Sequence, residues 1–473
     1  MTGVKNQIHN EIPLFKQVYD FALRRIEGGD WKEHEKVPSV RTMAAKMKMH
    51  RLTVLKAYQM LKNDNHLYVK DKSGYYVQPK DIRVFTQTDN PIVSSYVHKN
   101  HLSEIHQVKV DYQFSKALVN PKLLPTKFFS EYLKDVLVSE PEILGTYSTI
   151  EGDEKLRKHM SSYFIEKNNM HVDPAELVVF SGAQQVIYLV AQTFVKRRDT
   201  VLLERPSYSM AIDAFRQQGA EIIPVELFPD GYDIAEIEQL MKKHQPRLFY
   251  LNPTFHNPTG YTVPADQRKQ LVELAEAYGC LLVEDDTNYD IYFDEKPPPP
   301  IFSYDTEGYV IYIRGYSKYV SPGLRIAFAA CRAPLMNILK SAKSLADNGA
   351  PLLNQKMFLH YFFSDRMQTH LEKLRIALSI RKEIMEEELD KSGWKWVSPK
   401  GGLNLWVELP GHIPVERLLD ECLKNSISFV PGEICDPLKE RKAWIRLSYS
   451  FVNENEIRSG VRKLLRIADE ISS

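Results

Sequence analysis

The sequence has few cysteines and no long run of apolar residues. No stretch approaches the ~20 uncharged apolar residues of a membrane-spanning helix, so we expect no membrane segment. The first ten residues are polar and lack the apolar segment of a secretory signal, which predicts a cytoplasmic protein. The cysteines have no paired spacing, which favours reduced thiols over a disulfide framework or a zinc site: Cys280, Cys331, Cys422 and Cys435.

The net charge is also small, at +1, but it is unevenly distributed. Residues 1–80 contain fifteen Lys and Arg and eight Asp and Glu, an excess of seven positive charges. The rest of the chain therefore carries six net negative charges. A basic segment joined to a mildly acidic body favours a polyanionic partner for that segment, although a merely solvated basic surface would have the same composition.

The length of 473 residues predicts two to four domains. We expect a basic helical domain over residues 1–79, a polar linker with at most one short helix over 80–110, and an α/β domain over 111–473. In the last region short apolar runs alternate with amphipathic stretches, which predicts a parallel sheet covered by helices on both faces. The expected strands are Leu177–Ser181, Thr200–Glu204, Glu221–Val225, Leu248–Leu251, Leu281–Glu284 and Val310–Ile313.

The basic segment contains three short amphipathic helices. The first starts near Leu14 and should end at Gly28 and Gly29, and Ser39 is suited to cap the second. The third is expected from about Arg51 to Asn63, where three apolar residues at spacings of four and three form one buried face: Val54, Tyr58 and Leu61.

Two short strands follow these helices, Leu67–Val69 and Tyr75–Val77, with a tight turn at Ser73 and Gly74. Three helices and a hairpin make a winged helix-turn-helix, whose third helix fits the major groove of double-stranded DNA. Basic and hydroxyl side chains of such a unit contact phosphates and base edges. The DNA-binding residues that we expect are Ser39, Arg41, Arg51, Thr53, Lys56 and Gly74.

This segment resembles the DNA-binding domain of GntR-type bacterial regulators over almost its whole length. The resemblance is carried by residues 13–15, 23–28, 37–41, 43–44, 51–54 and 57–58, and by Leu61 and Gly74. It implies a DNA operator as partner and a bacterial cytoplasmic protein that associates with the nucleoid when bound to DNA. His50 stands where the family often has Ser, and the usual Gly before the wing is absent; both departures concern base preference rather than fold.

Lys318 lies in the most informative motif of the large domain, Ser317–Arg325. A lysine that forms an imine needs a lowered pKa, so it should be desolvated and near other positive charge. Arg325 follows a Pro-Gly turn and could hold a phosphate with its forked donors. Taken alone, a Ser-Lys pair would more often be a surface lysine beside a loop.

Four further segments support a cofactor site. The segment 252–260 ends a strand at a rigid turn, where an Asn could donate to a phenolate oxygen. Asp285 and Asp286 follow a buried strand, and a carboxylate there could keep a pyridine nitrogen protonated. Residues 181–183 open a helix and form an anion site, and Tyr208 could stack on a flat ring. Taken singly, Asp285 could be a helix cap and Tyr208 a core residue.

In this order and at these separations, the five segments resemble fold type I enzymes that use pyridoxal 5′-phosphate (PLP), the aspartate aminotransferase superfamily. Joined to a GntR-type head, the chain resembles the MocR subfamily of regulators. The resemblance implies a mainly parallel sheet, a smaller C-terminal α+β subdomain from about residue 360, and a homodimer. It implies an internal aldimine on Lys318, with further cofactor contacts from Asp285, Asn257, Tyr208, Gly182, Ala183, Ser317 and Arg325.

The resemblance also implies two residues that contact a substrate or effector. Arg446 matches an arginine that clamps a carboxylate bidentately, although an edge-strand arginine would have the same sequence context. Tyr147, in the loop that leads to Gly152, matches a segment that borders the site, often across a dimer interface.

Two positions depart from the family pattern. The family usually has Tyr two or three residues after the pyridine-binding Asp, where this chain has Thr287 and Asn288. If Asp286 were the partner, Tyr289 would fall at the three-residue offset, so both carboxylates stay candidates. Gly315 replaces a frequent phosphate-binding Ser, a loss worth roughly 0.5–1.5 kcal/mol for an ordinary hydrogen bond.

These features favour a DNA-binding transcription regulator that uses PLP on Lys318 to sense an amino-containing small molecule. An active aminotransferase with an appended DNA-binding head has the same residues, although Thr287 and Gly315 favour the regulator over efficient turnover. A regulator that senses PLP itself is a third possibility. The effector, the operator and the sign of regulation do not follow from the sequence.

Overall fold

The computed structural model describes residues 13–32, 34–64, 66–70, 73–78 and 101–472. It divides into two units at residues 98 and 99, and each unit is described by itself. The predicted linker over 80–110 lies outside the described residues as far as residue 100. Its remainder contains a helix, α5 (His101–Gln107), whose Leu102 and Ile105 are buried in the larger unit.

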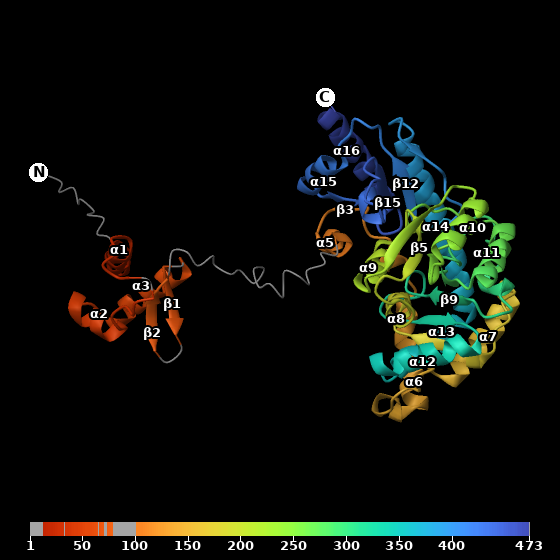
Figure 1. Ribbon diagram of the computed structural model, residues 1–473, viewed down its shortest axis with the longest axis horizontal. Coiled ribbons are helices and arrows are strands. Elements are labelled where there is room, and N and C mark those ends of the chain that lie inside the picture. The colour runs from red at the N-terminus through yellow and green to blue at the C-terminus, as the bar shows by residue number, and fades with distance from the viewer. Residues whose placement is uncertain (1–12, 33, 65, 71–72, 79–100, 473) are drawn as a thin grey trace, which may run out of the picture. The chain divides into compact units, whose positions relative to one another are not determined.

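The smaller unit is a winged helix-turn-helix, as predicted (Figure 1). Its helices are α1 (Leu14–Glu27), α2 (Val40–Met47) and α3 (Arg51–Asn63). The wing pairs β1 (Leu67–Lys70) with β2 (Gly74–Val77) in antiparallel register, with Leu67 opposite Val77. The three helices and the hairpin share one core of buried side chains, which includes Val18, Ala22, Met43, Val54, Tyr58, Leu61 and Val77.

Local capping sets where the helices of this unit begin. Ser39 caps α2, as predicted, because its Oγ accepts the amide N–H of Thr42 at 3.1 Å. His50 caps α3 in the same way through Nδ1, which accepts the N–H of Leu52 at 3.3 Å. His50 therefore replaces the usual serine without loss of the cap. Gly29 follows α1 with a φ of +77°, a conformation that favours glycine and ends the helix.

A seven-stranded sheet forms the centre of the larger unit, in the order β4-β10-β9-β8-β7-β5-β6. All neighbours are parallel except β10, which is antiparallel to both β4 and β9. The six predicted strands are present as β4 (Leu177–Phe180), β5 (Thr200–Arg205), β6 (Glu221–Glu226), β7 (Leu248–Leu251), β8 (Leu281–Asp285) and β9 (Val310–Gly315). The seventh strand, β10 (Ala327–Ala330), was not expected from the sequence, because it is short and rich in alanine.

Helices cover both faces of this sheet, as the apolar strands predict. One face packs on α8 (Ala183–Phe194), α9 (Ser209–Gln217) and α12 (Ala333–Ala346). The other face packs on α7 (Glu154–Asn168), α10 (Ile234–His244), α11 (Ala265–Tyr278), α13 (Leu352–Phe362) and α14 (Asp365–Leu389). Side chains alternate between the faces, so Val283 lies in the first core and Leu282 in the second.

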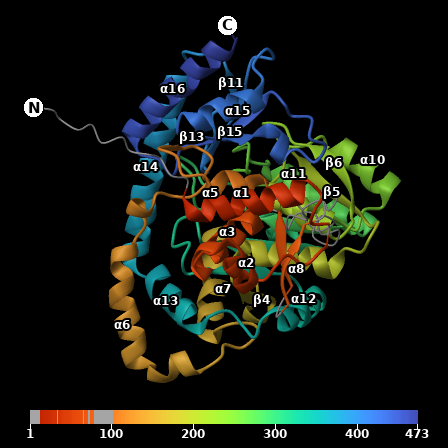
Figure 2. The same ribbon diagram turned by 90° about the vertical axis from the view of Figure 1, so that its left-hand side faces the viewer.

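A smaller antiparallel sheet completes the larger unit, in the order β11-β12-β15-β14. Its strands are β11 (Lys395–Trp396), β12 (Asn404–Glu408), β14 (Val430–Pro431) and β15 (Trp444–Ser448), and α15 (Val415–Lys424) and α16 (Glu454–Ser472) accompany them. This region lies at the opposite end of the unit from α6 (Phe129–Ser139) and α13 (Figures 1 and 2). This is the smaller C-terminal α+β part of the fold; its strands begin at Lys395, and the start expected near residue 360 stays a prediction.

The start of the larger unit is joined to that subdomain. Strand β3 (Tyr112–Gln113) pairs in parallel with β13 (Ile427–Ser428), and Leu102 of α5 packs on Trp406 and Val430. Residues more than three hundred positions apart therefore form one layer. Within the described residues, no helix is both long and apolar enough to span a membrane.

We predict that Leu61→Ala unfolds the smaller unit selectively. Leu61 is fully buried in α3, so its truncation should cost about 2–5 kcal/mol. Leu52→Ala on the same helix is the control, because Leu52 is 67% exposed. Hydrogen exchange of the full chain should rise throughout residues 13–78 in the first variant only, with the larger unit unchanged. Equal effects of the two variants would contradict the assigned core face.

Candidate functional site

Lys318 lies in the turn that follows β9, half-buried in the larger unit. Its Nζ donates a hydrogen bond to the carbonyl oxygen of Ala117 at 2.7 Å. Burial, and then the positive charges of Arg446 and Arg325, lower the pKa of Lys318 to about 8, against the opposing effect of Asp285. This lysine therefore has the desolvated, electropositive surroundings that nucleophilic amines require.

Asp285 ends β8 on the same face of the sheet as α8 and α9. Its carboxylate accepts hydrogen bonds from Tyr250 at 2.8 Å and from Thr287 at 2.7 Å. Burial raises the pKa of Asp285, while these hydrogen bonds and the charge of Lys318 lower it. Both donors stabilise the ionised carboxylate rather than the neutral acid.

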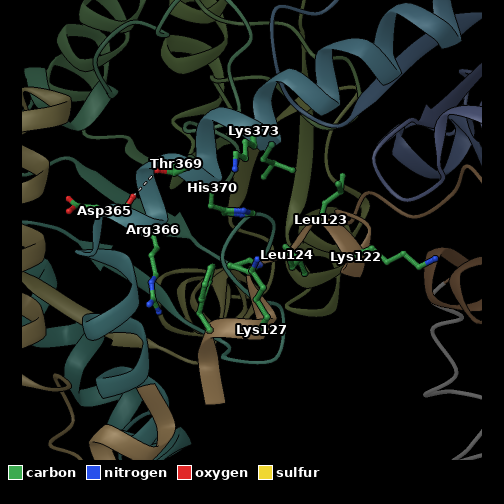
Figure 3. Close-up of a pocket in the computed structure, with 12 residues that line it drawn as sticks. Lys122, Leu123, Leu124, Lys127, Asp365, Arg366, Thr369, His370 and Lys373 are labelled. Carbon is green, nitrogen blue, oxygen red and sulfur yellow. Dashed lines mark hydrogen bonds between the residues drawn. The ribbon is translucent and has the colours of Figure 1, made fainter. Parts of the chain in front are cut away.

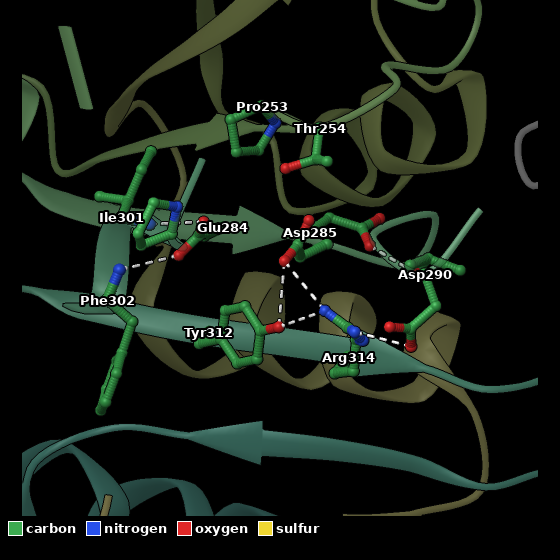
Figure 4. Close-up of polar contacts among 12 residues, drawn as sticks. Pro253, Thr254, Glu284, Asp285, Asp290, Ile301, Phe302, Tyr312 and Arg314 are labelled. Atoms are coloured by element: carbon green, nitrogen blue, oxygen red, sulfur yellow. Dashed lines mark hydrogen bonds and ion pairs between the residues drawn. The ribbon is translucent and has the colours of Figure 1, made fainter. Parts of the chain in front are cut away.

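Asp286 points to the opposite face, because successive residues of a strand alternate. Its carboxylate accepts from the hydroxyl of Tyr312 at 3.0 Å and pairs with Arg314 at 3.2 Å. Arg314 also pairs with Asp290 at 2.7 Å and lies 4.4 Å from the ring centre of Tyr289 (Figure 4). Asp285, and not Asp286, thus shares a face with Lys318, and the Asp286–Tyr289 alternative belongs to a separate buried ion network.

Asn257 and Arg446 meet beside Lys318. The Oδ1 of Asn257 accepts a hydrogen bond from Nη1 of Arg446 at 3.0 Å. This leaves the Asn257 amide nitrogen as a donor directed to other groups. Nη2 of Arg446 donates to the carbonyl oxygen of Ser115, and its Nε is buried without a protein partner.

The start of α8 forms an anion cradle with Arg325. Gly182 has a φ of +101°, and a Cβ added there would lie 2.4 Å from Nη2 of Arg325. Arg325 also donates to the carbonyl of Ser181 at 3.2 Å, so only glycine allows this approach. The first turn of a helix leaves backbone N–H groups free, and with the guanidinium they can bind a phosphate. Gly182, Ala183 and Arg325 therefore lie together, and their contact with a phosphate stays a prediction.

The two departures from the family pattern are in contact with each other. A Cβ on Gly315 would lie 3.2 Å from both Oγ1 and Cγ2 of Thr287, and 3.4 Å from Cβ of Ala183. The glycine therefore leaves room for Thr287, whose hydroxyl binds Asp285. A serine at position 315 would crowd this threonine. Asn288 is directed elsewhere, since its amide donates to the carbonyl of Phe255 at 2.9 Å.

Tyr208 and Ser317 lie close to these groups. Burial, and then the charge of Asp285, raise the pKa of Tyr208, whereas Arg446 and Arg325 lower it, so the ring lies among the charged groups of the site. Ser317 is half-buried in the same turn as Lys318. Tyr147 differs from the other predicted residues: it is 82% exposed and lies outside the buried cluster of the single chain.

Two hollows lie elsewhere in this unit. The first, of about 480 Å³, lies between the residues before α6 and the start of α14, and His370 in its wall bonds the carbonyl of Tyr319 at 2.8 Å (Figure 3). The second, of about 510 Å³, lies between α7 and the segment at Phe363. Neither contains the charged groups gathered at Lys318, so we place the chemical site at Lys318.

The residues expected to bind DNA differ in exposure and in their contacts within the head. Arg41 and Arg51 are exposed, and Thr53 is half-buried. The ammonium group of Lys56 lies 4.1 Å from the ring centre of Phe15, so Lys56 is held against α1. Gly74 has a φ of +122° at the wing turn. Leu52 is an apolar residue beside Arg51 at the start of α3, and it is 67% exposed. It was not among the residues expected from the sequence to bind DNA.

The sequence analysis also missed residues that line the Lys318 site. Backbone carbonyls of Ser115 and Ala117 carry no sequence signal, yet they bind Arg446 and Lys318. His106 of α5 lies near the same two cations, and burial and the charge of Arg446 lower its pKa to about 4. Tyr250, the hydroxyl donor to Asp285, occurs within a strand that reads only as apolar core.

These groups fit PLP. The site offers a neutralisable amine, a buried carboxylate that accepts hydrogen bonds from Tyr250 and Thr287, an amide donor and an anion cradle that a Cβ at Gly182 would fill. Each has a counterpart in the aldehyde, pyridine nitrogen, phenolic oxygen and phosphate of that cofactor. The orphaned Nε of Arg446 adds a buried donor for a further anion.

Two family models match the chain. Residues 125–464 match the family of class I and II aminotransferases, and residues 14–77 match bacterial regulatory proteins of the gntR family. The chain is 35% identical over 359 residues to a 2-aminoadipate transaminase of Thermus thermophilus, covering 75% of this chain and 89% of that relative. It is 28% identical over 468 residues to YisV, an uncharacterized HTH-type transcriptional regulator of Bacillus subtilis, covering 96% and 95%.

A solved structure agrees with these matches. LysN, the α-aminoadipate aminotransferase of Thermus thermophilus, in complex with N-(5′-phosphopyridoxyl)-L-leucine, has a TM-score of 0.74 and 32% identity, covering 80% of this chain and 96% of its own. Its bound phosphopyridoxyl group and the family match identify PLP as the cofactor. The chain belongs to the class I and II aminotransferase family and, with its GntR-type head, is a MocR-type transcription regulator.

Proposed function

We propose that this regulator holds PLP on Lys318 and changes its binding to DNA when an amino compound with a carboxylate occupies the site. The observation that carries the proposal is the cluster of Lys318, Asp285 and Arg446 in a chain that also has a winged head. A ligand shifts a DNA-binding equilibrium only by its difference in affinity for the two states.

The residues around Lys318 would supply complementary contacts to the cofactor. PLP supplies an electron-poor ring whose aldehyde can bind an amino group covalently. Asp285 would face the pyridine nitrogen, the Asn257 amide would donate to the phenolic oxygen, and Tyr208 would stack on the ring. Gly182, Ala183 and Arg325 would hold the phosphate, with Ser317 beside Lys318.

Lys318 must lose its proton before it can attack an aldehyde. At a pKa of about 8, about one-tenth of the amine is neutral at pH 7, far more than for an ordinary lysine of pKa about 10.4. Arg446 contributes to this lowering, so the residue proposed to bind the ligand carboxylate also prepares the amine. The charge of Asp285 opposes this lowering of the Lys318 pKa and favours the ammonium form.

A homodimer is part of the proposal. The loop residues Leu144 and Tyr147 are 72% and 82% exposed, and Leu345 at the end of α12 is 90% exposed. Their segments adjoin, because a Cβ on Gly349 would lie 2.6 Å from the carbonyl oxygen of Thr149. Exposed apolar side chains of this kind are typical of interaction surfaces. In a dimer Tyr147 would border the partner's ligand site, and two heads would bind repeated half-sites.

The pH dependence of cofactor attachment tests the state of Lys318. Only the neutral amine attacks, so the rate at which cofactor-free protein binds PLP covalently should rise with pH, with a midpoint of about 8. Arg446→Gln removes a positive neighbour and should move the midpoint to higher pH. Borohydride trapping with mass spectrometry of the Lys318 peptide measures the rate. Lys373→Gln, at an exposed site, should leave the midpoint unchanged, and a midpoint near 10 in the parent protein would contradict the assignment.

Ligand response and turnover can be measured in one assay with L-leucine and a 2-oxo acid. We expect a saturable change in the absorbance of bound PLP and a shift in DNA affinity, without continuous production of the leucine-derived oxo acid. Arg446→Gln should need about 10- to 100-fold more leucine, because a charged hydrogen-bond pair contributes about 1.5–3 kcal/mol.

Other results of that assay identify the competing functions. Many turnovers per site would indicate a working aminotransferase, which the 2-aminoadipate transaminase relative makes a concrete alternative. A DNA response to PLP alone that survives Arg446→Gln would indicate a sensor of PLP itself. Either result would contradict the proposed amino-compound sensor.

DNA binding by the head should depend on Arg51. Arg51→Gln removes an exposed cation at the start of α3 and should reduce the slope of log affinity against log salt by about one on a mixed-sequence duplex. Arg25→Gln is the matched control, because Arg25 pairs with Asp30 at 2.8 Å on α1. An equal loss in both variants would show a general charge effect rather than a recognition surface.

A further inference from the structure

Two backbone carbonyls of the segment 115–117 accept hydrogen bonds from Lys318 and Arg446, two cations of the ligand site. The carbonyl of Ala117 accepts from Nζ of Lys318 at 2.7 Å, and the carbonyl of Ser115 accepts from Nη2 of Arg446. The segment is held at its sides, since the carbonyl of Phe114 accepts the Ser448 N–H at 2.8 Å and Ser115 Oγ lies 3.0 Å from Ser428 Oγ. It therefore stands where an anionic ligand would bind Arg446.

His106 binds the same carbonyl as Arg446. Its Nε2 lies 3.0 Å from the carbonyl oxygen of Ser115, an acceptor, so Nε2 must carry the hydrogen and donate. Burial and the neighbouring positive charge of Arg446 lower the pKa of His106 to about 4, so the ring is neutral and has one N–H for this bond. The Ser115 carbonyl is thus shared between the ligand-binding arginine and α5.

Helix α5 is also attached through its two buried apolar side chains, Leu102 and Ile105. Leu102 packs with Trp406, Val430 and Cys435, and Tyr208 packs against the same cluster. Its last residue, Gln107, is exposed. Helix α5 is also the first described element of the larger unit after residues 79–100, so it follows the head directly in chain order among the described elements.

We propose that His106 is a positioning residue that reports occupancy of Arg446 to α5. A ligand carboxylate takes Nη2 together with the unpartnered Nε of Arg446, which is the bidentate geometry that a guanidinium favours, and so removes the Ser115 carbonyl from Arg446. The freed Ser115–Ala117 segment shifts, and His106 carries the shift to α5. The inference rests on the proposed function and makes the carboxylate, rather than the amine, the signal.

L-Leucine and 3-methylbutylamine are suitable probes, because they differ only by the carboxylate. In the full-length, PLP-loaded protein both should change the absorbance of the cofactor. Only leucine should increase amide hydrogen exchange in α5 and change DNA affinity, by about fivefold or more as in typical coupled sites. Equal exchange in α5 with both probes would overturn the proposal.

Variants separate this coupling from simple loss of structure. His106→Phe should give fast α5 exchange without ligand and abolish the further increase with leucine, whereas His106→Gln keeps an N–H donor and should restore the response. Gln107→Ala, next to His106 on the same helix, should behave as the parent protein. Failure of His106→Gln to restore any response would mean that His106 only packs.

A ligand-free variant keeps the test independent of the proposed function. Arg446→Met removes the guanidinium from the Ser115 carbonyl, as a carboxylate would, and should increase α5 exchange with no ligand present. An unchanged helix would overturn the coupling, whatever ligand the protein senses. If neither probe changes the cofactor absorbance, the proposed amino-compound sensor fails, and Arg446→Met still decides the coupling.

Discussion

The chemistry of the site in the larger unit depends on the desolvation of one amine, that of Lys318. Lys318 is half-buried with two arginines near it, and this desolvation favours its neutral form. A buried amine of this kind needs a nearby negative charge to limit the energetic cost, and Asp285 supplies it from the end of β8. The turn after β9, the end of β8, strand β15 and the start of α8 bring the cofactor contacts and the ligand arginine together around this amine.

Successive side chains at the end of β8 point to opposite faces of the sheet, and this separates two groups of charged residues. Asp285 faces the cofactor side, while Asp286 on the opposite side joins Arg314, Tyr312 and Asp290. The second system is buried and joined by ion pairs, although Asp286 Oδ1 and Arg314 Nε have no hydrogen-bond partner among the described residues. Gly315 and Thr287, the two departures from the family pattern, are linked, because the absence of a side chain at Gly315 leaves room for Thr287.

Much of the fold follows from local patterns. The head is predictable because its helices have clear caps and an apolar period, and the parallel strands because they are continuous apolar runs between turns. β10 is not, because Ala327–Ala330 lacks β-branched residues and is defined by its pairing with β4 and β9. The choice between Asp285 and Asp286 depends on which core each face meets, and the contact of His106 with Ser115 involves a backbone carbonyl, which no motif encodes.

The pairing of β3 with β13 has a mechanical consequence. The chain enters the larger unit through the layer that holds the C-terminal subdomain, not through the seven-stranded sheet. Any rotation of that subdomain against the sheet must therefore carry the attachment point of the head along with it. The first described residues of the larger unit thus belong to the subdomain that carries Arg446 and not to the sheet that carries Asp285.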